Sequence, residues 1–297
     1  MGQPLSDLAA SFRRDLRAEG KAPRTAELYL QSITYFSNWL RSEGQSDSLD
    51  NLTRPNIRTW LAGLTERNEN STVRTRYKGL RRFCRWLVAE DILDTDPMDG
   101  MEPPPAQNKP VPILTDDELT AVLKQCQGKG FETRRNEALI RVLMDTGCRV
   151  SELVGITLED LDLDRESATV TGKGNKVRPL YFSAKTARAL DRYLRERAKH
   201  RYASDPALFL SQRGRMSGDG VRDLVHRLGV QAGIDDLHPH RFRHTFAHDF
   251  LVSGGQERDL KRLAGWSSDV MLERYGASAA DQRAEQAARR LRRGDRV

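Results

Sequence analysis

The sequence is poor in cysteine and has no long apolar run. Its three cysteines, Cys84, Cys126 and Cys148, are widely spaced and form no Cys-x-x-Cys pair, so they suggest neither a disulfide framework nor a thiolate zinc site. No apolar stretch approaches the roughly 20 residues of a membrane helix. The N-terminus MGQPLSDLAASFRRDL also lacks the apolar core of a signal peptide. We therefore expect a cytoplasmic protein with no membrane partner.

Charge, by contrast, is abundant. Of the 297 residues, 31% are charged and 38% are hydrophobic, and the net charge is +7. A chain of this length has room for roughly two domains that each bury a core. The positive balance favours a polyanionic partner, but only weakly, because many basic proteins bind no nucleic acid.

Prolines divide the chain near residue 105. Five of the 12 prolines lie between residues 103 and 112, where they exclude a helix or a central strand and predict an extended linker of limited flexibility. The apolar spacing upstream is helical throughout. We accordingly predict an all-helical domain at 1–102, a linker at 103–112 and a second domain at 113–297.

The most informative upstream helix covers residues 72–90, "TVRTRYKGLRRFCRWLVAE". One face is apolar: Val73, Tyr77, Leu80, Cys84 and Leu87. Another face is basic: Arg74, Lys78, Arg81, Arg82 and Arg85. A basic stripe beside an apolar one suits a helix laid along a phosphate backbone, since each cation can neutralise a phosphate. A solvated surface face is the alternative.

The second domain is predicted to be mostly helical with a small antiparallel sheet, so the whole fold is mainly α. Thr115-Asp-Asp-Glu118 is typical of a capping box that opens a helix. Strands are expected at 168–171 and 178–182, joined by the turn-rich Gly172-Lys-Gly-Asn-Lys176. Helices are expected afterwards: 187–198, 220–232, 239–252, 257–264 and 269–275, with one more in the tail at 279–293.

Two motifs with familiar chemistry are disfavoured. Gly172-Lys173-Gly174 is not a P-loop, because Ser167 stands where that motif needs glycine and Gly174 where it needs Ser or Thr. In the segment "HPHRFRHTFAHDF", Phe242, Phe246 and Phe250 are expected to form a buried face. The histidines at 240, 244 and 248 share another face, but a neighbouring arginine opposes a metal cation and suits an anion better.

Five short segments together identify a protein family more specifically than any one of them does alone. They are Arg149 in "TGCRVSE", Lys173 in "TGKGNK", His240-x-x-Arg243, Trp266 in "LAGW" and Tyr275 in "ERYGAS". Their order and spacing resemble the tyrosine recombinase (phage integrase) family over nearly the whole chain. The resemblance implies a helical, SAM-like core-binding domain, then the linker, then a catalytic domain.

The resemblance also implies a reaction. Tyr275 would attack a DNA phosphodiester, giving a 3′-phosphotyrosyl link and a free 5′-hydroxyl without metal, ATP or any other cofactor. Arg149 and Arg243 would stabilise the charge on the non-bridging oxygens. Lys173 would be the general acid for the leaving oxygen, and His240 would assist proton transfer or hydrogen-bond the phosphate.

Two further positions have narrower expected roles. Many relatives, including the Xer recombinases, carry His where this chain has Trp266, whereas Cre resembles it in carrying Trp. An indole donates one N–H and cannot shuttle a proton, so Trp266 would bind the phosphate or would only pack the nucleophile's helix. Glu152 lies one helical turn from Arg149 and could hold its guanidinium, the alternative being a surface glutamate.

The implied partner is double-stranded DNA carrying a specific inverted-repeat core site. The basic helix and Lys176 would contact it, and the enzyme would be associated with the nucleoid. A homotetramer on DNA is expected through exchange of the C-terminal helix, and accessory DNA-bending proteins are left open. Because the chain starts almost directly with the core-binding domain, we expect no separate arm-site-binding domain.

Other functions compete with this interpretation. A type IB topoisomerase-like enzyme would keep the chemistry without strand exchange. A DNA-binding regulator that never cuts would be expected to have lost one or more of the catalytic side chains, yet all are present. Metal-dependent hydrolysis is supported less well than either of these alternatives.

Overall fold

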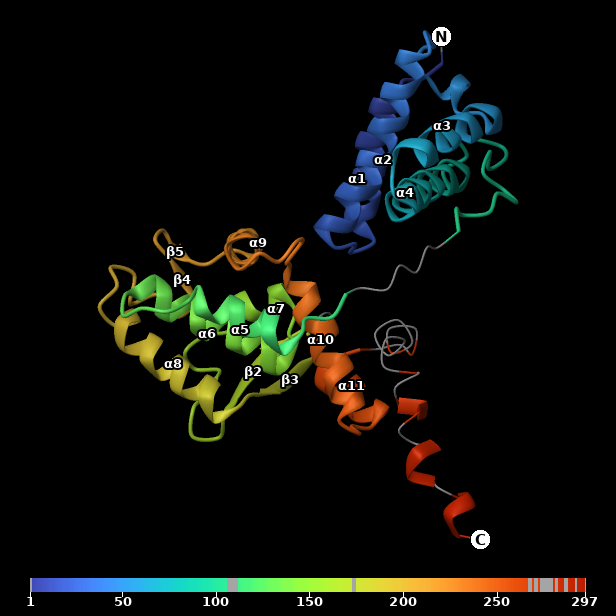
Figure 1. The fold of residues 1–297 in the computed structure, drawn as a ribbon. Coiled ribbons are helices and arrows are strands. Elements are labelled where there is room, and N and C mark those ends of the chain that lie inside the picture. The colour runs from blue at the N-terminus through green and yellow to red at the C-terminus, as the bar shows by residue number, and fades with distance from the viewer. Residues whose placement is uncertain are drawn as a thin grey trace. The chain divides into compact units, whose positions relative to one another are not determined.

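The computed structural model describes residues 2–105, 112–172 and 175–266. Towards the C-terminus it describes positions 269, 272, 280, 283–285, 288–291 and 293–296. Lys173 and Tyr275 lie outside the described residues, as do most of the helix expected at 269–275 and part of the helix expected at 279–293. The chain forms two compact units, Met1–Asn108 and Lys109–Val297 (Figure 1).

In the part of the first unit that the structure describes, every named element is a helix. Its elements are α1 (Leu5–Ala18), α2 (Pro23–Ser42), the 3-10 helix η1 (Leu49–Asn51), α3 (Arg54–Arg67) and α4 (Asn70–Ala89). Aliphatic and aromatic side chains form its core, in which Phe12 and Phe83 are fully buried with ring centroids 5.4 Å apart. Helices α2 and α4 approach closely at Gly79, where an added Cβ would lie 2.3 Å from Ser32 Oγ.

The expected apolar face of α4 is confirmed, because all five of its side chains are at most 2% exposed. The start of the proline-rich segment is irregular and runs along this helix. Its carbonyl groups accept hydrogen bonds from α4: Tyr77 and Arg81 donate to Met101 O, Arg74 to Pro104 O and Asn70 to Pro105 O. Prolines offer no N–H of their own, so donors from a helix side chain are the means of fixing such a segment.

The second unit combines helices with two small antiparallel sheets. Its helices are α5 (Asp116–Lys124), α6 (Phe131–Thr146), α7 (Val150–Gly155), α8 (Ala184–Arg197), α9 (Gly218–Ala232), α10 (Pro239–Val252), α11 (Glu257–Ala264) and the 3-10 helix η2 (Arg293–Arg296). The capping box at Thr115 is confirmed: Glu118 N–H donates to Thr115 Oγ1 at 3.2 Å, and Thr115 N–H to Glu118 Oε2 at 2.8 Å.

The two predicted strands are present within one residue of their expected bounds, and the described residues form three further short strands. Strands β1 (Leu161–Asp162), β2 (Ser167–Thr171) and β3 (Val177–Tyr181) form one antiparallel sheet. The β2–β3 hairpin is closed by Gly172 N–H, which donates to Lys176 O at 2.8 Å. A second pair, β4 (Leu210–Ser211) and β5 (Gly214–Arg215), carries too few residues to show an alternating pattern in the sequence.

Helix α6 occupies the middle of this unit and leads into the candidate site. It packs against α8, α10 and β3, and Leu139, Ile140 and Leu143 on it are fully buried. Among the helices that the structure describes, none is both long enough and apolar enough to cross a membrane.

The expected buried face of α10 is only partly right. Phe242 is 1% exposed, but Phe246 and Phe250 are only partly buried, while His244 and His248 are 7% and 8% exposed. Because α6, α9 and α11 all pack against α10, this helix is covered on more than one side and its periodicity underestimates its burial.

The three thiols are free and buried. Burial raises the pKa of Cys126 to about 12 and that of Cys148 to about 11, and it raises the pKa of the Cys84 thiol as well. These side chains therefore act as small hydrophobic groups of the two cores.

Candidate active site

The site begins at the turn between α6 and α7. Gly147 ends α6 in the left-handed region with φ +53°, and an added Cβ there would lie 2.7 Å from Phe246 Cδ1. The turn places Arg149 at the N-cap of α7. Its backbone N–H donates to Glu152 Oε2 at 2.8 Å, and its Nη1 donates to Glu152 Oε1 at 2.9 Å. Glu152 therefore caps the helix and also holds the arginine.

Arg243 reaches the same place from α10. It is 2% exposed, and its two terminal nitrogens donate to Gly147 O at 2.7 Å and to Ala264 O at 2.6 Å. Its guanidinium carbon lies 5.4 Å from the ring centroid of Trp266, which is 6% exposed. This arginine therefore joins α10 to the end of α6 and to the end of α11.

A third arginine, Arg178 on β3, belongs to the cluster although the sequence did not point to it. Its Nη2 donates to Glu152 Oε2 at 2.8 Å, and its Nη1 donates to Leu263 O. One sequence signal was available: Arg178 is two residues from the buried Leu180, so strand alternation puts both on the covered face of the sheet.

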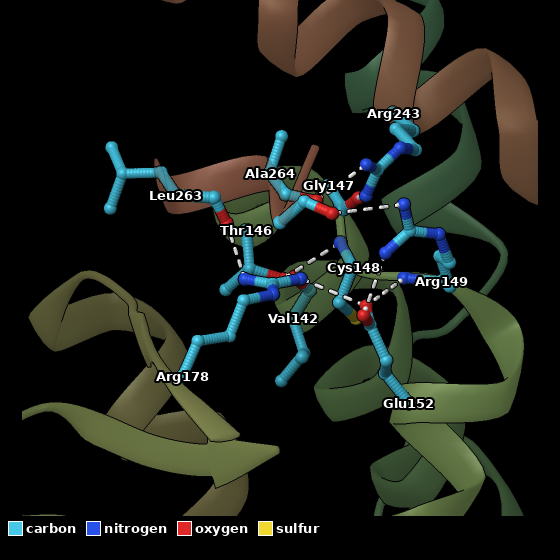
Figure 2. A network of polar contacts seen from close by, with 11 residues as sticks. Val142, Thr146, Gly147, Cys148, Arg149, Glu152, Arg178, Arg243, Leu263 and Ala264 are labelled. Atoms are coloured by element: carbon cyan, nitrogen blue, oxygen red, sulfur yellow. Dashed lines mark hydrogen bonds and ion pairs between the residues drawn. The ribbon is translucent and has the colours of Figure 1, made fainter. Parts of the chain in front are cut away.

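The C-terminal end of α11 is where the three arginines meet (Figure 2). Three successive carbonyl oxygens accept one guanidinium each: Leu263 O from Arg178, Ala264 O from Arg243 and Gly265 O from Arg149, the last at 3.3 Å. Carbonyl groups at a helix end have no partner in the helix and carry its negative dipole, so cations stabilise them.

Gly265 makes this approach possible. Its φ is +63°, and an added Cβ would lie 2.8 Å from Arg178 Nε and 3.6 Å from Arg149 Nη1. The left-handed turn lets Trp266 N–H donate back to Lys261 O at 3.0 Å. A side chain at this position would be strained and would also displace Arg178.

The electrostatics of the cluster favour an anion. The cluster holds three guanidinium groups and the carboxylate of Glu152, which is 2% exposed and pairs with Arg149 and Arg178. Burial alone would raise the pKa of Glu152, but the N–H of Arg149 and the charges of Arg178 and Arg149 outweigh it, so the pKa lies below its ordinary value. Glu152 therefore stays ionised, and positive charge remains in excess.

The other predicted side chains take varied positions. His240 is exposed in the first turn of α10, one turn before Arg243, and Lys176 is exposed beside the β2–β3 turn. That turn begins at Gly172, where an added Cβ would lie 3.2 Å from Glu152 Oε1, so its first residue adjoins the arginine cluster.

The predicted DNA-contacting residues on α4 divide into two groups. Arg74 and Arg81 donate to the carbonyl groups of the proline-rich segment, and Arg82 pairs with Glu19. Lys78 and Arg85 are exposed.

Comparisons with known proteins identify the family. The model named "Phage integrase family" matches residues 112–282, which is more than half of the chain, and the model named "Phage integrase, N-terminal SAM-like domain" matches residues 8–94. The chain is a tyrosine recombinase of the phage integrase family. Enzymes of this family cleave and rejoin DNA, and the function of this recombinase is site-specific recombination.

Curated relatives cover most of the recombinase. Tyrosine recombinase XerD of Bifidobacterium longum is 30% identical over 86% of this chain and 87% of its own. Tyrosine recombinase XerC of Oceanobacillus iheyensis is 32% identical over 87% of each.

Solved structures support the fold. XerH site-specific recombinase bound to palindromic difH substrate superposes with a TM-score of 0.76 at 20% identity, covering 91% of this chain and 81% of that one. A lambda integrase dimer bound to a COC′ core site gives a TM-score of 0.72 at 17% identity, covering 92% of this chain and 95% of that one.

The charge of Glu152 is expected to contribute to stability. Removing one partner of a buried ion pair costs about 3–5 kcal/mol. Glutamine keeps one acceptor, so we expect Glu152→Gln to lower the free energy of unfolding by about 2–3 kcal/mol at pH 7. Because the folded pKa is lowered, this contribution is complete above the ordinary value of 4.5 and is lost as the pH falls through the folded pKa.

Urea unfolding of wild type, Glu152→Gln and the exposed control Glu159→Gln, followed from pH 7 down into the acid range, tests this expectation. A wild-type advantage that stays constant on acidification would contradict it.

Gly265→Ala is expected to damage the site more than a matched glycine does. Gly233 ends α9 with φ +71° and has nothing within 4 Å of an added Cβ. Gly233→Ala should therefore cost about 1 kcal/mol from its backbone alone. Gly265→Ala should cost about 2–3 kcal/mol, because it also displaces Arg178. Thermal and urea unfolding compare the two, and equal losses would show that the contact with Arg178 is unimportant.

Proposed function

We propose that Arg149 and Arg243 hold the scissile phosphate of duplex DNA and that Tyr275 attacks it. The observation that carries this proposal is the convergence of the two arginines, from α7 and α10, on the adjacent carbonyls Ala264 O and Gly265 O. The segment that follows leads directly to Tyr275 in the sequence. The positively charged cluster is therefore followed, a short distance along the chain, by Tyr275, the proposed phenol nucleophile.

The reaction would proceed in two transfers. The phenolic oxygen forms a bond to phosphorus as the bond to the 5′-oxygen breaks, which leaves a 3′-phosphotyrosyl link and, after protonation, a 5′-hydroxyl. A 5′-hydroxyl of the partner strand then attacks phosphorus and releases the tyrosine. The guanidinium groups stabilise the added charge on the non-bridging oxygens in both transfers. No metal or ATP enters this scheme.

Three more side chains complete the proposed site. Lys173 would protonate the 5′-oxygen, and support for this role comes from the position of the preceding Gly172 beside Glu152. His240 would assist transfer of the tyrosine proton or bind the phosphate. Trp266 would donate its indole N–H to a phosphate oxygen, and support for this role comes from the guanidinium of Arg243, whose carbon lies 5.4 Å from the centroid of the Trp266 ring.

The proposal extends to the DNA and the assembly. We assign 1–102 as the core-binding domain, 103–112 as the linker and 113–297 as the catalytic domain with an exchanged C-terminal helix. The target would be a core site with inverted repeats bound by a homotetramer, in the cytoplasm with the nucleoid. Among solved structures of this fold, XerH is bound to a palindromic substrate and lambda integrase to a core site.

The basic side chains of α4 would supply affinity and register by contacting phosphates. The exposed Lys78 and Arg85 are the best placed to do so, together with Lys176 beside the hairpin turn. Arg74, Arg81 and Arg82 already have partners in the first unit, so they would contact DNA with the N–H groups that remain.

Trapping the covalent intermediate tests this function. A pool of nicked duplexes, with two randomised arms facing each other across a short spacer, is incubated with the full chain in EDTA. DNA that stays attached to protein in detergent is sequenced. Wild type should enrich one inverted repeat and Tyr275→Phe none, because only the phenol oxygen can form the link.

The other outcomes of the trapping experiment each exclude something. Equal recovery with wild type and Tyr275→Phe would overturn the proposal. Loss of adducts in EDTA would indicate metal-dependent chemistry. Relaxation of supercoiled plasmids that lack the enriched site would favour a topoisomerase-like enzyme.

Substitutions at Trp266 separate phosphate binding from packing. Trp266→Phe removes the N–H and should slow single-turnover cleavage about 10-fold or more, the typical loss when one phosphate or oxyanion donor is removed. Trp266→His restores a donor and should stay close to wild type. Cleavage of the enriched duplex by Trp266→Phe at the wild-type rate would show that this side chain only packs.

A further inference from the structure

Arg178 has contacts in the structure that no catalytic role explains. Its side chain is 10% exposed and lies between β3, the start of α7 and the end of α11. One terminal nitrogen donates to Glu152 Oε2 at 2.8 Å and the other to Leu263 O (Figure 2). Both terminal nitrogens of its planar guanidinium therefore donate hydrogen bonds, one to α7 and the other to α11.

The contact with Glu152 determines which way that carboxylate faces. Oε2 accepts two donors, Arg178 Nη2 and the backbone N–H of Arg149, each at 2.8 Å. With Oε2 held on both sides, Oε1 is left aimed at Arg149 Nη1, 2.9 Å away. Arg178 thus controls the rotation of the carboxylate that holds the Arg149 guanidinium.

The contact with Leu263 O fixes a second part of the site. Leu263 directly precedes Ala264 and Gly265, whose carbonyls accept from Arg243 and Arg149. An arginine on β3 therefore ties the hairpin to the end of α11, after which the chain continues to Trp266. Arg149 is more exposed than Arg243: 33% of its side chain is exposed, whereas Arg243 is 2% exposed.

We propose that Arg178 is a positioning residue of the recombination reaction. It fixes Arg149 through the shared carboxylate of Glu152, and it fixes the end of α11 relative to the β2–β3 hairpin. It does not contact the phosphate itself. This inference rests on the proposed function, because it assigns Arg178 a part in forming the phosphate site described above.

The test compares Arg178→Gln with Arg178→Lys and with Arg165→Gln as a matched control. Arg165 is in the same antiparallel sheet region but is 85% exposed, and it contacts only Asp162 among the described residues. Single-turnover cleavage of the duplex enriched with wild-type protein is measured at saturating enzyme. The dissociation constant for the same duplex and the unfolding temperature are measured alongside.

Arg178→Gln should slow cleavage about 10- to 100-fold, a typical loss for a side chain that orients a group at the reaction centre. Its dissociation constant should change less than about threefold, since the phosphate-contacting arginines remain. Arg178→Lys should recover part of the rate, because an ammonium can pair with Glu152 but cannot also reach Leu263 O. Arg165→Gln should match wild type.

A double-mutant cycle with Glu152→Gln separates positioning from general destabilisation. If Arg178 acts through Glu152, the double variant should cleave no more than about threefold slower than the slower single variant. Rate losses that multiply would overturn the proposal, as would an Arg178→Gln rate equal to that of Arg165→Gln.

Two controls keep the result interpretable. If Arg178→Gln is unfolded, the comparison passes to Arg178→Lys and Arg165→Lys, and equal rates of these two would overturn the proposal. Absence of any adduct with wild-type protein would instead overturn the proposed function, which keeps the two failures distinct.

Discussion

The second unit depends on how the end of one short helix is capped. The last carbonyls of α11 need hydrogen-bond donors, and arginines from α7, α10 and β3 provide them. These donors come from three elements that are far apart in the sequence, so the same contacts assemble the site. The two left-handed glycines, Gly147 and Gly265, let backbone and side chains come close enough for these bonds.

A single carboxylate keeps this cationic cluster stable without neutralising it. Glu152 accepts from the backbone and side chain of Arg149 and from Arg178. Its lowered pKa keeps it charged at neutral pH, so the repulsion between guanidinium groups is partly offset. In the proposed reaction, the excess of positive charge that remains would attract the phosphodiester. One ion-pair network would then support both the fold and the chemistry.

The parts of the structure that depend on local sequence were predictable. Helical spacing placed Glu152 beside Arg149, and turn residues placed the hairpin where the structure has it. Arg178 was missed because its partners lie 26 and 85 residues away, a relation that no local pattern reveals. The burial of His244 was missed for a similar reason, since three other helices cover α10 and its own periodicity does not show them. Tertiary packing determined both.

The guanidinium of Arg243 binds backbone carbonyl groups at two helix ends. An arginine offers five N–H groups, and the bonds to Gly147 O and Ala264 O take one from each terminal nitrogen. The same side chain thus joins parts of the scaffold and, in the proposed reaction, also contacts the substrate. A substitution at this position removes both, so its effect on rate alone does not measure transition-state stabilisation.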